Sequence, residues 1–266
     1  MTPRVPTSVL LVRLAAPLQS WGDRSSPLNR RETRPEPTKS GVVGLLAAAA
    51  GRSRYAPLDD LTGLALGIRI DQPGSILRDY HTVSDYRGQP LLSAAVNTKG
   101  LQKPTSPAKR THITQRFYLQ DAVFLAAVEG PQELIATLEH AVRHPAFPLA
   151  LGRRSCAPSQ PLALGQRPGS LEDVLREEPW QAARAVRRRW GRANGDAPHV
   201  RLPATLDDPA GDEVRDDVPL SFAPAGRAFT TRRTRHTYLE APTGLTPDPQ
   251  RPGNTGGHDP FALLGW

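Results

Sequence analysis

Runs of apolar residues predict most of the elements in the first half of the chain. Ser8 to Ala15 is rich in leucine and valine and predicts a β-strand. Residues 37–51 hold small and apolar residues and predict a helix, with Thr38 able to cap its first amides and Gly51 able to end it. Leu64 to Asp71 predicts a second strand, which ends at a turn containing proline and glycine.

The middle of the chain alternates polar and apolar residues. Ile76 to Ser84 predicts a strand, and Thr111 to Asp121 alternates before an apolar run through Val128, which indicates one long strand or a pair. Residues 85–109 are too long and too polar for an ordinary connection. We expect a protruding basic arm or hairpin there, with a disordered insertion as the alternative. Pro131 to Arg143 predicts a second helix.

This order of elements is typical of an α+β fold of the ferredoxin-like or RRM-like kind, which we expect over residues 1–160. From about residue 161 the composition shifts to proline, glycine and charge. For residues 161–266 we expect a small, mostly β C-terminal portion with a partly helical basic segment at 171–192 and a basic strand at 228–238. The acidic stretch 207–217 is most simply a solvated loop.

Charge points to an acidic partner. The 266 residues carry a formal net charge of +8 and a sequence pI near 10.2, mostly through arginine, whose planar guanidinium suits phosphate. A GC-rich genome would also raise the arginine content. The single cysteine, Cys156, rules out an intrachain disulfide and fits a reducing cytoplasm. No apolar run approaches the length needed to span a membrane, so we expect a cytoplasmic protein without membrane contact.

The start of the helix at 37–51 is a candidate anion site. The first amides of a helix point outward with partial positive charge, and Lys39 stands beside them after an arginine-rich loop at 30–37. The alternative is that Lys39 only decorates a buried helix. The loop lacks the glycines of a nucleotide-binding P-loop. Trp21, at the end of the first strand, could stack on a base or anchor the core.

Catalytic patterns are weak in this sequence. The seven histidines and one cysteine form no metal-ligand pattern, and no serine lies in a nucleophile elbow, so we expect no metal or cofactor. Lys109 and His112, beside Tyr80 or Tyr118, could supply the base, acid and cation of metal-free RNA cleavage. The same side chains could equally stack on bases and hold phosphates, and we favour binding.

Several short motifs together carry a family resemblance. They resemble the CasD-type RAMP subunits of type I-E CRISPR Cascade surveillance complexes. Beyond residue 161 the resemblance is thin, with only His258 to Phe261 familiar. The motifs occur in the family's order at residues 17–22, 37–41, 77–82, 116–122 and 151–156.

The resemblance implies an RRM-like RAMP domain with a thumb hairpin at about 85–112. It implies a non-catalytic subunit that caps the 5′ handle of the CRISPR RNA (crRNA) beside a backbone subunit and a large subunit, and that meets target DNA only through the complex. In a related subtype the equivalent subunit cleaves precursor RNA with tyrosine, lysine and histidine. A metal-independent endoribonuclease acting through Tyr80, Lys109 and His112 therefore stays the alternative. The implied RNA contacts are Gln19, Ser20, Trp21, Arg34, Thr38, Lys39, Ser40, Lys109, Arg110, Arg116, Arg153, Arg154 and Ser155.

Overall fold

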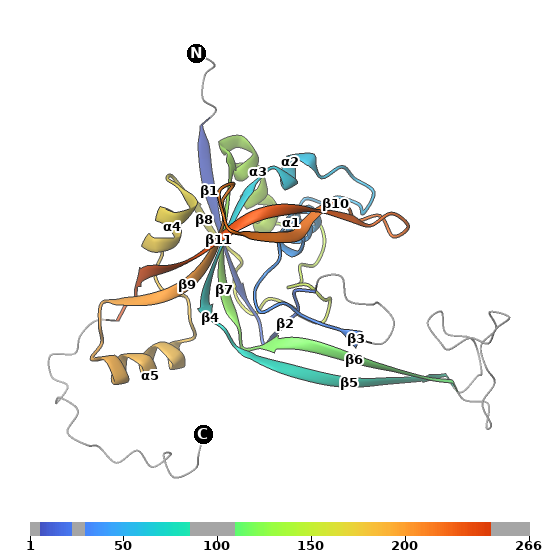
Figure 1. Cartoon of the computed structure of the whole chain (residues 1–266), viewed down its shortest axis with the longest axis horizontal. Coiled ribbons are helices and arrows are strands. Elements are labelled where there is room, and N and C mark those ends of the chain that lie inside the picture. The colour runs from blue at the N-terminus through green and yellow to red at the C-terminus, as the bar shows by residue number, and fades with distance from the viewer. Residues whose placement is uncertain (1–5, 23–29, 86–109, 246–266) are drawn as a thin grey trace, which may run out of the picture.

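The computed structural model describes residues 6–22, 30–85 and 110–245, which form two β-sheets with helices on both faces of the larger sheet (Figure 1). The larger sheet has seven strands, and all the pairings recorded for it are antiparallel. Its order is β10 (Glu213–Ser221), β11 (Ala228–Pro242), β9 (His199–Asp207), β4 (Ala65–Gln72), β7 (Val123–Pro131), β1 (Thr7–Ala15) and β8 (Ala163–Arg167).

Helices pack on the two faces of the larger sheet because its central strands bury side chains on both sides. On β1, Leu10 and Leu14 pack in the core beneath α1 (Lys39–Ala49) and α3 (Gln132–Arg143), whereas Val9 and Leu11 face α4 (Leu171–Glu177). Two further helices complete the described set: α2 (Asp59–Thr62) and α5 (Arg184–Asn194). No helix in the described ranges is both long and apolar enough to cross a membrane.

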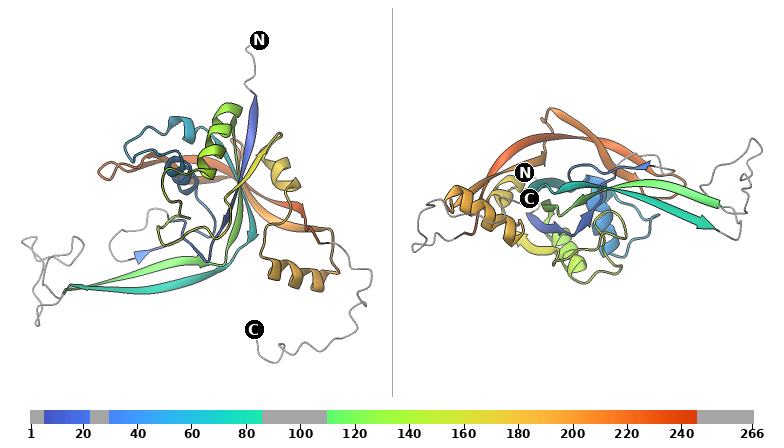
Figure 2. Two further views of the ribbon diagram at one scale, coloured as in Figure 1. Left: turned by 180° about the vertical axis from the view of Figure 1, so that it is seen from behind. Right: turned by 90° about the horizontal axis from the view of Figure 1, so that it is seen from below.

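The smaller sheet is built around a long two-stranded ribbon that projects from the body of the molecule (Figures 1 and 2). The ribbon pairs β5 (Ser75–Asp85) with β6 (Arg110–Gln120) in antiparallel register, and β2 (Leu18–Gln19) and β3 (Arg30–Arg31) pair with the other edge of β6. The predicted arm at 85–109 lies, apart from Asp85, outside the described residues.

The apolar continuation predicted after Asp121 is a separate strand. Asp121 has a φ of 56°, in the left-handed region, so the chain turns sharply between β6 and β7. β6 belongs to the ribbon and β7 to the centre of the larger sheet. Of the two possibilities left open by the sequence, the strand pair is confirmed.

The C-terminal strands complete the larger sheet. β8 pairs with β1 and β9 pairs with β4, so residues after 160 share a sheet with the N-terminal elements. The prediction of a solvated acidic loop at 207–217 is wrong, because Asp207 ends β9 and Asp217 is a buried residue of β10.

Candidate nucleic-acid interface

Helix α1 begins and ends as its sequence predicts. The side chain of Thr38 accepts a hydrogen bond from the Gly41 amide at 3.2 Å, and Gly51 follows the helix with a φ of +72°. Glycine is required at position 41 because a Cβ there would lie 2.7 Å from the ring of Trp21. The first turn of α1 is therefore packed directly against the Trp21 side chain.

The start of α1 is already occupied by carboxylates of the C-terminal strands. The Lys39 amide donates to Asp217 Oδ2 at 2.8 Å, and Lys39 Nζ lies 3.0 Å from Asp207 Oδ2. Arg232 pairs with both carboxylates, with its Nε 2.6 Å from Asp217 Oδ1. Lys39 is 7% exposed, and Thr38 and Ser40 are buried beside it. The expected open phosphate site is therefore not met, and the structure favours the alternative of a lysine on a buried helix.

The turn after β1 is also part of the core. Gln19 Nε2 donates to the carbonyl oxygens of Leu14 at 3.0 Å and Ala122 at 2.7 Å, and Trp21 Nε1 donates to Gln19 Oε1 at 3.1 Å. Gln19, Ser20 and Trp21 are all buried. These three predicted RNA contacts instead tie β1 to the ribbon and the body, which is the core-anchor interpretation of Trp21.

A glycine turn brings the paired arginines to the base of the ribbon. The Ser20 amide donates to the Leu151 carbonyl at 3.1 Å, and a Cβ on Gly152, whose φ is +91°, would lie 1.8 Å from the Ser20 carbonyl oxygen. Only glycine permits this close approach. The turn leaves Arg153 half-buried and Arg154 and Ser155 exposed.

Arg153 joins the turn to two other basic segments. Its Nη2 donates to the Arg31 carbonyl at 2.9 Å, and its guanidinium carbon lies 4.6 Å from the centre of the Tyr118 ring. Arg31 pairs directly with Arg116 on β6, and Arg116 and Tyr118 share one face of that strand. We call Arg31, Arg116, Arg153 and Arg154 the basic cradle.

Two N–H groups of the basic cradle are buried without a hydrogen-bond partner in the described part of the chain: Arg116 Nε and Arg153 Nη1. Arg154 makes no ion pair with any described residue and is exposed. Buried guanidinium N–H groups are normally satisfied, so unpaired ones indicate that an acceptor is needed. The basic cradle thus combines high positive charge with unused donors.

The proposed catalytic set is not brought together. Tyr80 pairs with Gln115 and Val83 pairs with His112, so the Tyr80 and His112 positions fall on opposite faces of the ribbon. Tyr118 shares the face of position 112 but lies six residues along the strand, roughly 20 Å away. No observation on the described ribbon favours the endoribonuclease alternative.

The remaining predicted contacts fall outside the basic cradle. Lys109 lies outside the described residues, and Arg110 is described only through its backbone pairing with Asp85. The Arg34 amide donates to the Trp21 carbonyl at 2.8 Å, and the Arg34 side chain lines a cavity beside α1.

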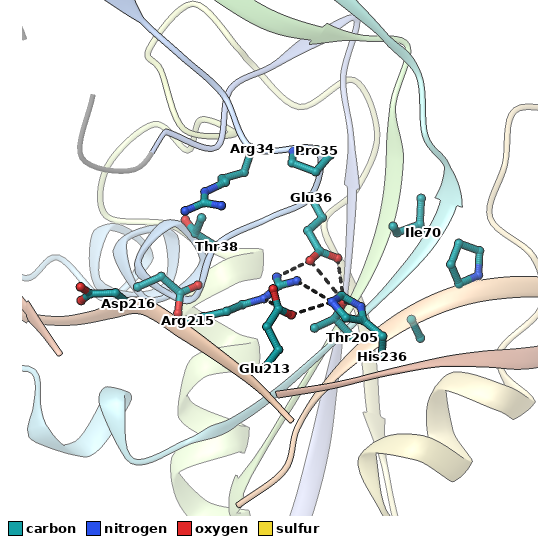
Figure 3. Close-up of a pocket in the computed structure, with 13 residues that line it drawn as sticks. Arg34, Pro35, Glu36, Thr38, Ile70, Thr205, Glu213, Arg215, Asp216 and His236 are labelled. Atoms are coloured by element: carbon teal, nitrogen blue, oxygen red, sulfur yellow. Dashed lines mark hydrogen bonds and ion pairs between the residues drawn. The ribbon is translucent and has the colours of Figure 1, made fainter. Parts of the chain in front are cut away.

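This cavity, of about 330 Å³, lies between the loop before α1 and the strands β9, β10 and β11 (Figure 3). Thr205 Oγ1 lies 2.9 Å from buried Glu36 and 3.0 Å from His236 Nδ1, and His236 Nε2 lies 2.6 Å from Glu213. Arg215 pairs with both glutamates. Burial alone would raise the pKa of Glu213, but Arg215 and His236 outweigh it and lower that pKa. These groups satisfy one another and fix the β10–β11 hairpin against the body.

Sequence reasoning missed this ionic network because its members lie about two hundred residues apart or more in some cases, and only the alternation of charged residues in 213–217 and 232–236 could have indicated paired strands. Within the described ranges, no cluster of histidine, cysteine and acidic side chains is placed to hold a metal ion.

Comparison with known proteins agrees with these features. Residues 9–235 match the family described as CRISPR-associated protein (Cas5). The "CRISPR system Cascade subunit CasD" of Escherichia coli (strain K12) is 35% identical over 192 residues, which cover 65% of this chain and 78% of the relative. A chain of a "CRISPR RNA-guided surveillance complex" superposes with a TM-score of 0.71 at 34% identity, covering 92% of this chain and 95% of that one. A "Crystal structure of Cas protein" gives a TM-score of 0.63 at 32% identity, covering 89% and 98%. The chain therefore belongs to the Cas5 family of CRISPR-associated proteins.

Proposed function

We propose that this chain is a CasD-type subunit of a Cascade surveillance complex and that it caps the 5′ handle of the crRNA. It does so without catalysing RNA cleavage, beside the backbone subunit and the large subunit, while target DNA is bound by the complex as a whole. Membership of the Cas5 family and the 35% identity to a Cascade subunit support this assignment.

The basic cradle is the observation that carries the proposal for RNA. Three segments far apart in the sequence bring Arg31, Arg116 and the pair Arg153 and Arg154 to the base of the ribbon. Forked guanidinium donors suit phosphate oxygens, and the unpartnered N–H groups of Arg116 and Arg153 would gain acceptors from an RNA backbone. The handle therefore binds here, and not at the buried start of α1.

We infer that the central strands form the RRM-like unit and that the ribbon is the base of the thumb. The chain runs β1, α1, β4, β7, α3, β8, and these strands are ordered β4-β7-β1-β8 in the sheet, as in a ferredoxin-like arrangement. The ribbon is inserted between β4 and β7. In this position it would separate the handle from the rest of the crRNA.

The test is the affinity of the full chain for a synthetic RNA that carries the repeat-derived handle. The double variant Arg116→Gln with Arg153→Gln removes the two half-buried donors. Its control, Arg54→Gln with Arg227→Gln, removes the same charge at exposed positions on other loops. We expect the cradle variant to lose about tenfold or more in affinity, because hydrogen bonds from charged donors are lost. Its salt slope should fall by roughly 0.7 per phosphate contact.

Crosslinking of bound RNA, followed by mapping of the attached peptides, locates the contact directly. The proposal expects crosslinks in the peptides that contain residues 113–118 and 151–156. Equal losses in the cradle and control variants would show that positive charge acts diffusely. Crosslinks confined to other segments would refute the basic cradle as the RNA site.

A further inference from the structure

A second, separate cationic surface lies on helix α5. Five of its eleven residues are arginine, and the exposed ones are Arg184, Arg188, Arg189 and Arg192. None of the five makes an ion pair with a residue in the described ranges, and the Nε of the fifth, Arg187, is buried without a hydrogen-bond partner. α5 and the ribbon lie on opposite sides of the molecule in all three views (Figures 1 and 2).

The arginines of α5 are arranged at a cost to the folded protein. Arg184, Arg188 and Arg192 are spaced four residues apart, so neighbouring like charges repel along one face of the helix. Arg184 also stands in the first turn, where the helix dipole disfavours a cation, and no acidic residue is present in that turn. An unbalanced stripe of charge on an ordered helix indicates an external anion.

The other face of α5 excludes two common uses of a basic amphipathic helix. Trp190 and Val186 pack on a small core with Trp180, and the two tryptophan rings meet edge to face with centroids 5.6 Å apart. Because this apolar face is already buried against the sheet, it is not available to enter a lipid surface or the groove of a partner protein. Only the charged face is presented.

We propose that the arginine face of α5 binds the phosphate backbone of double-stranded DNA. The stripe from Arg184 to Arg192 is a rigid row about 12 Å long, at 1.5 Å per residue. Single strands are usually held by exposed aromatic rings on which bases stack, and both tryptophans of this region are turned inward. A regular duplex needs only charge at a fixed spacing. This site is distinct from the basic cradle and does not depend on RNA binding there.

The experiment measures binding of the full chain to a short DNA duplex of arbitrary sequence, by fluorescence anisotropy over a range of salt concentrations. The face variant combines Arg184→Gln, Arg188→Gln and Arg192→Gln. The control combines Arg54→Gln, Arg201→Gln and Arg227→Gln, which are exposed and remove the same charge elsewhere. A third protein carries lysine at the three α5 positions, which preserves charge, and unfolding curves of all variants check that each is folded.

We expect the face variant to lose about tenfold or more in duplex affinity and its salt slope to fall by about 0.9 for each phosphate contact removed. The control and the lysine variant should keep most of the affinity, and the affinity of the face variant for the single-stranded handle RNA should not change. That last measurement separates this proposal from the basic cradle.

Three results would overturn the α5 proposal. The wild-type chain could fail to bind duplex DNA, or the control could lose as much affinity as the face variant. The face variant could also bind duplex normally but fail to assemble with the other subunits of the complex, which would identify an acidic protein surface as the partner of α5.

Discussion

At the scale of single residues, a buried ion pair fixes the C-terminal segment to the central sheet. Arg69 and Asp71 on β4 are both fully buried, with two contacts of 2.8 Å between them. The Arg69 guanidinium also donates to backbone carbonyls after α4, including that of Pro179 at 3.0 Å. Asp71 in turn accepts from the Gln181 amide at 2.6 Å. The pair therefore satisfies backbone groups that no other described side chain reaches.

Arg69→Leu should lower the free energy of unfolding by about 3–5 kcal/mol, because it leaves Asp71 buried without its partner charge. Urea unfolding followed by circular dichroism measures the change. The matched control is Arg176→Leu, which breaks an exposed ion pair with Glu172 on α4 and should cost about 1 kcal/mol or less. Equal costs for the two variants would contradict this role for Arg69.

Asp217 makes stability depend on acid. Burial alone would raise its pKa, but the hydrogen bonds and charge of Arg232, with the Lys39 amide, outweigh burial and lower the pKa. Since the unfolded chain has the higher value, about 3.9, this stabilisation is complete well above that pH and is lost as pH falls through the folded pKa.

Asp217→Asn should therefore lower the free energy of unfolding at neutral pH by roughly 2 kcal/mol, the size of a hydrogen bond to a charged group. The difference from wild type should shrink as pH falls below about 4. Unfolding curves at several pH values measure it, with Asp212→Asn, at an exposed position with no such contacts, as the control. A difference that persists unchanged in acid would mean that the carboxylate charge is not the cause.

At the scale of elements, local pattern was sufficient for the helices and strands with a strong period. The strand at 8–15, the helix with Thr38 as its cap and the helix ending at Arg143 agree with the structure to within a few residues. The use of a site residue was harder to predict. Lys39 is buried because its partner carboxylates arrive from strands 168 and 178 residues later in the chain, and nothing local to the helix shows that they will.

The ribbon makes a prediction about chemistry. Because the Tyr80 and His112 positions fall on opposite faces, they do not form one acid–base pair across the phosphate. The purified chain should leave labelled repeat RNA intact in the presence of a metal chelator, and His112→Ala should behave in the same way. Gel analysis of the RNA is the measurement. Cleavage that disappears in His112→Ala would restore the endoribonuclease alternative.

At the scale of the whole molecule, the division at residue 160 that composition suggests is not a division of the sheet. Every strand after that point pairs, directly or through a neighbour, with β1 or β4. Sequence alone could not show this, because strand order depends on pairing between distant segments and the charged residues after 207 conceal their alternation. The C-terminal strands also supply the carboxylates that close the start of α1.

A chain ending at residue 160 should therefore fail to fold cooperatively. It would lose the partners of β1 and β4 and would uncover the apolar face on which Val174 and Leu175 of α4 pack against Val9, Leu11 and Leu125. Exposed strand edges beside an uncovered apolar face favour aggregation. The control is a chain ending at residue 245, which keeps every described strand. Soluble yield and thermal unfolding distinguish the two. Cooperative unfolding of the shorter chain would show instead that the N-terminal unit is an independent domain and that the later strands are added to a finished core.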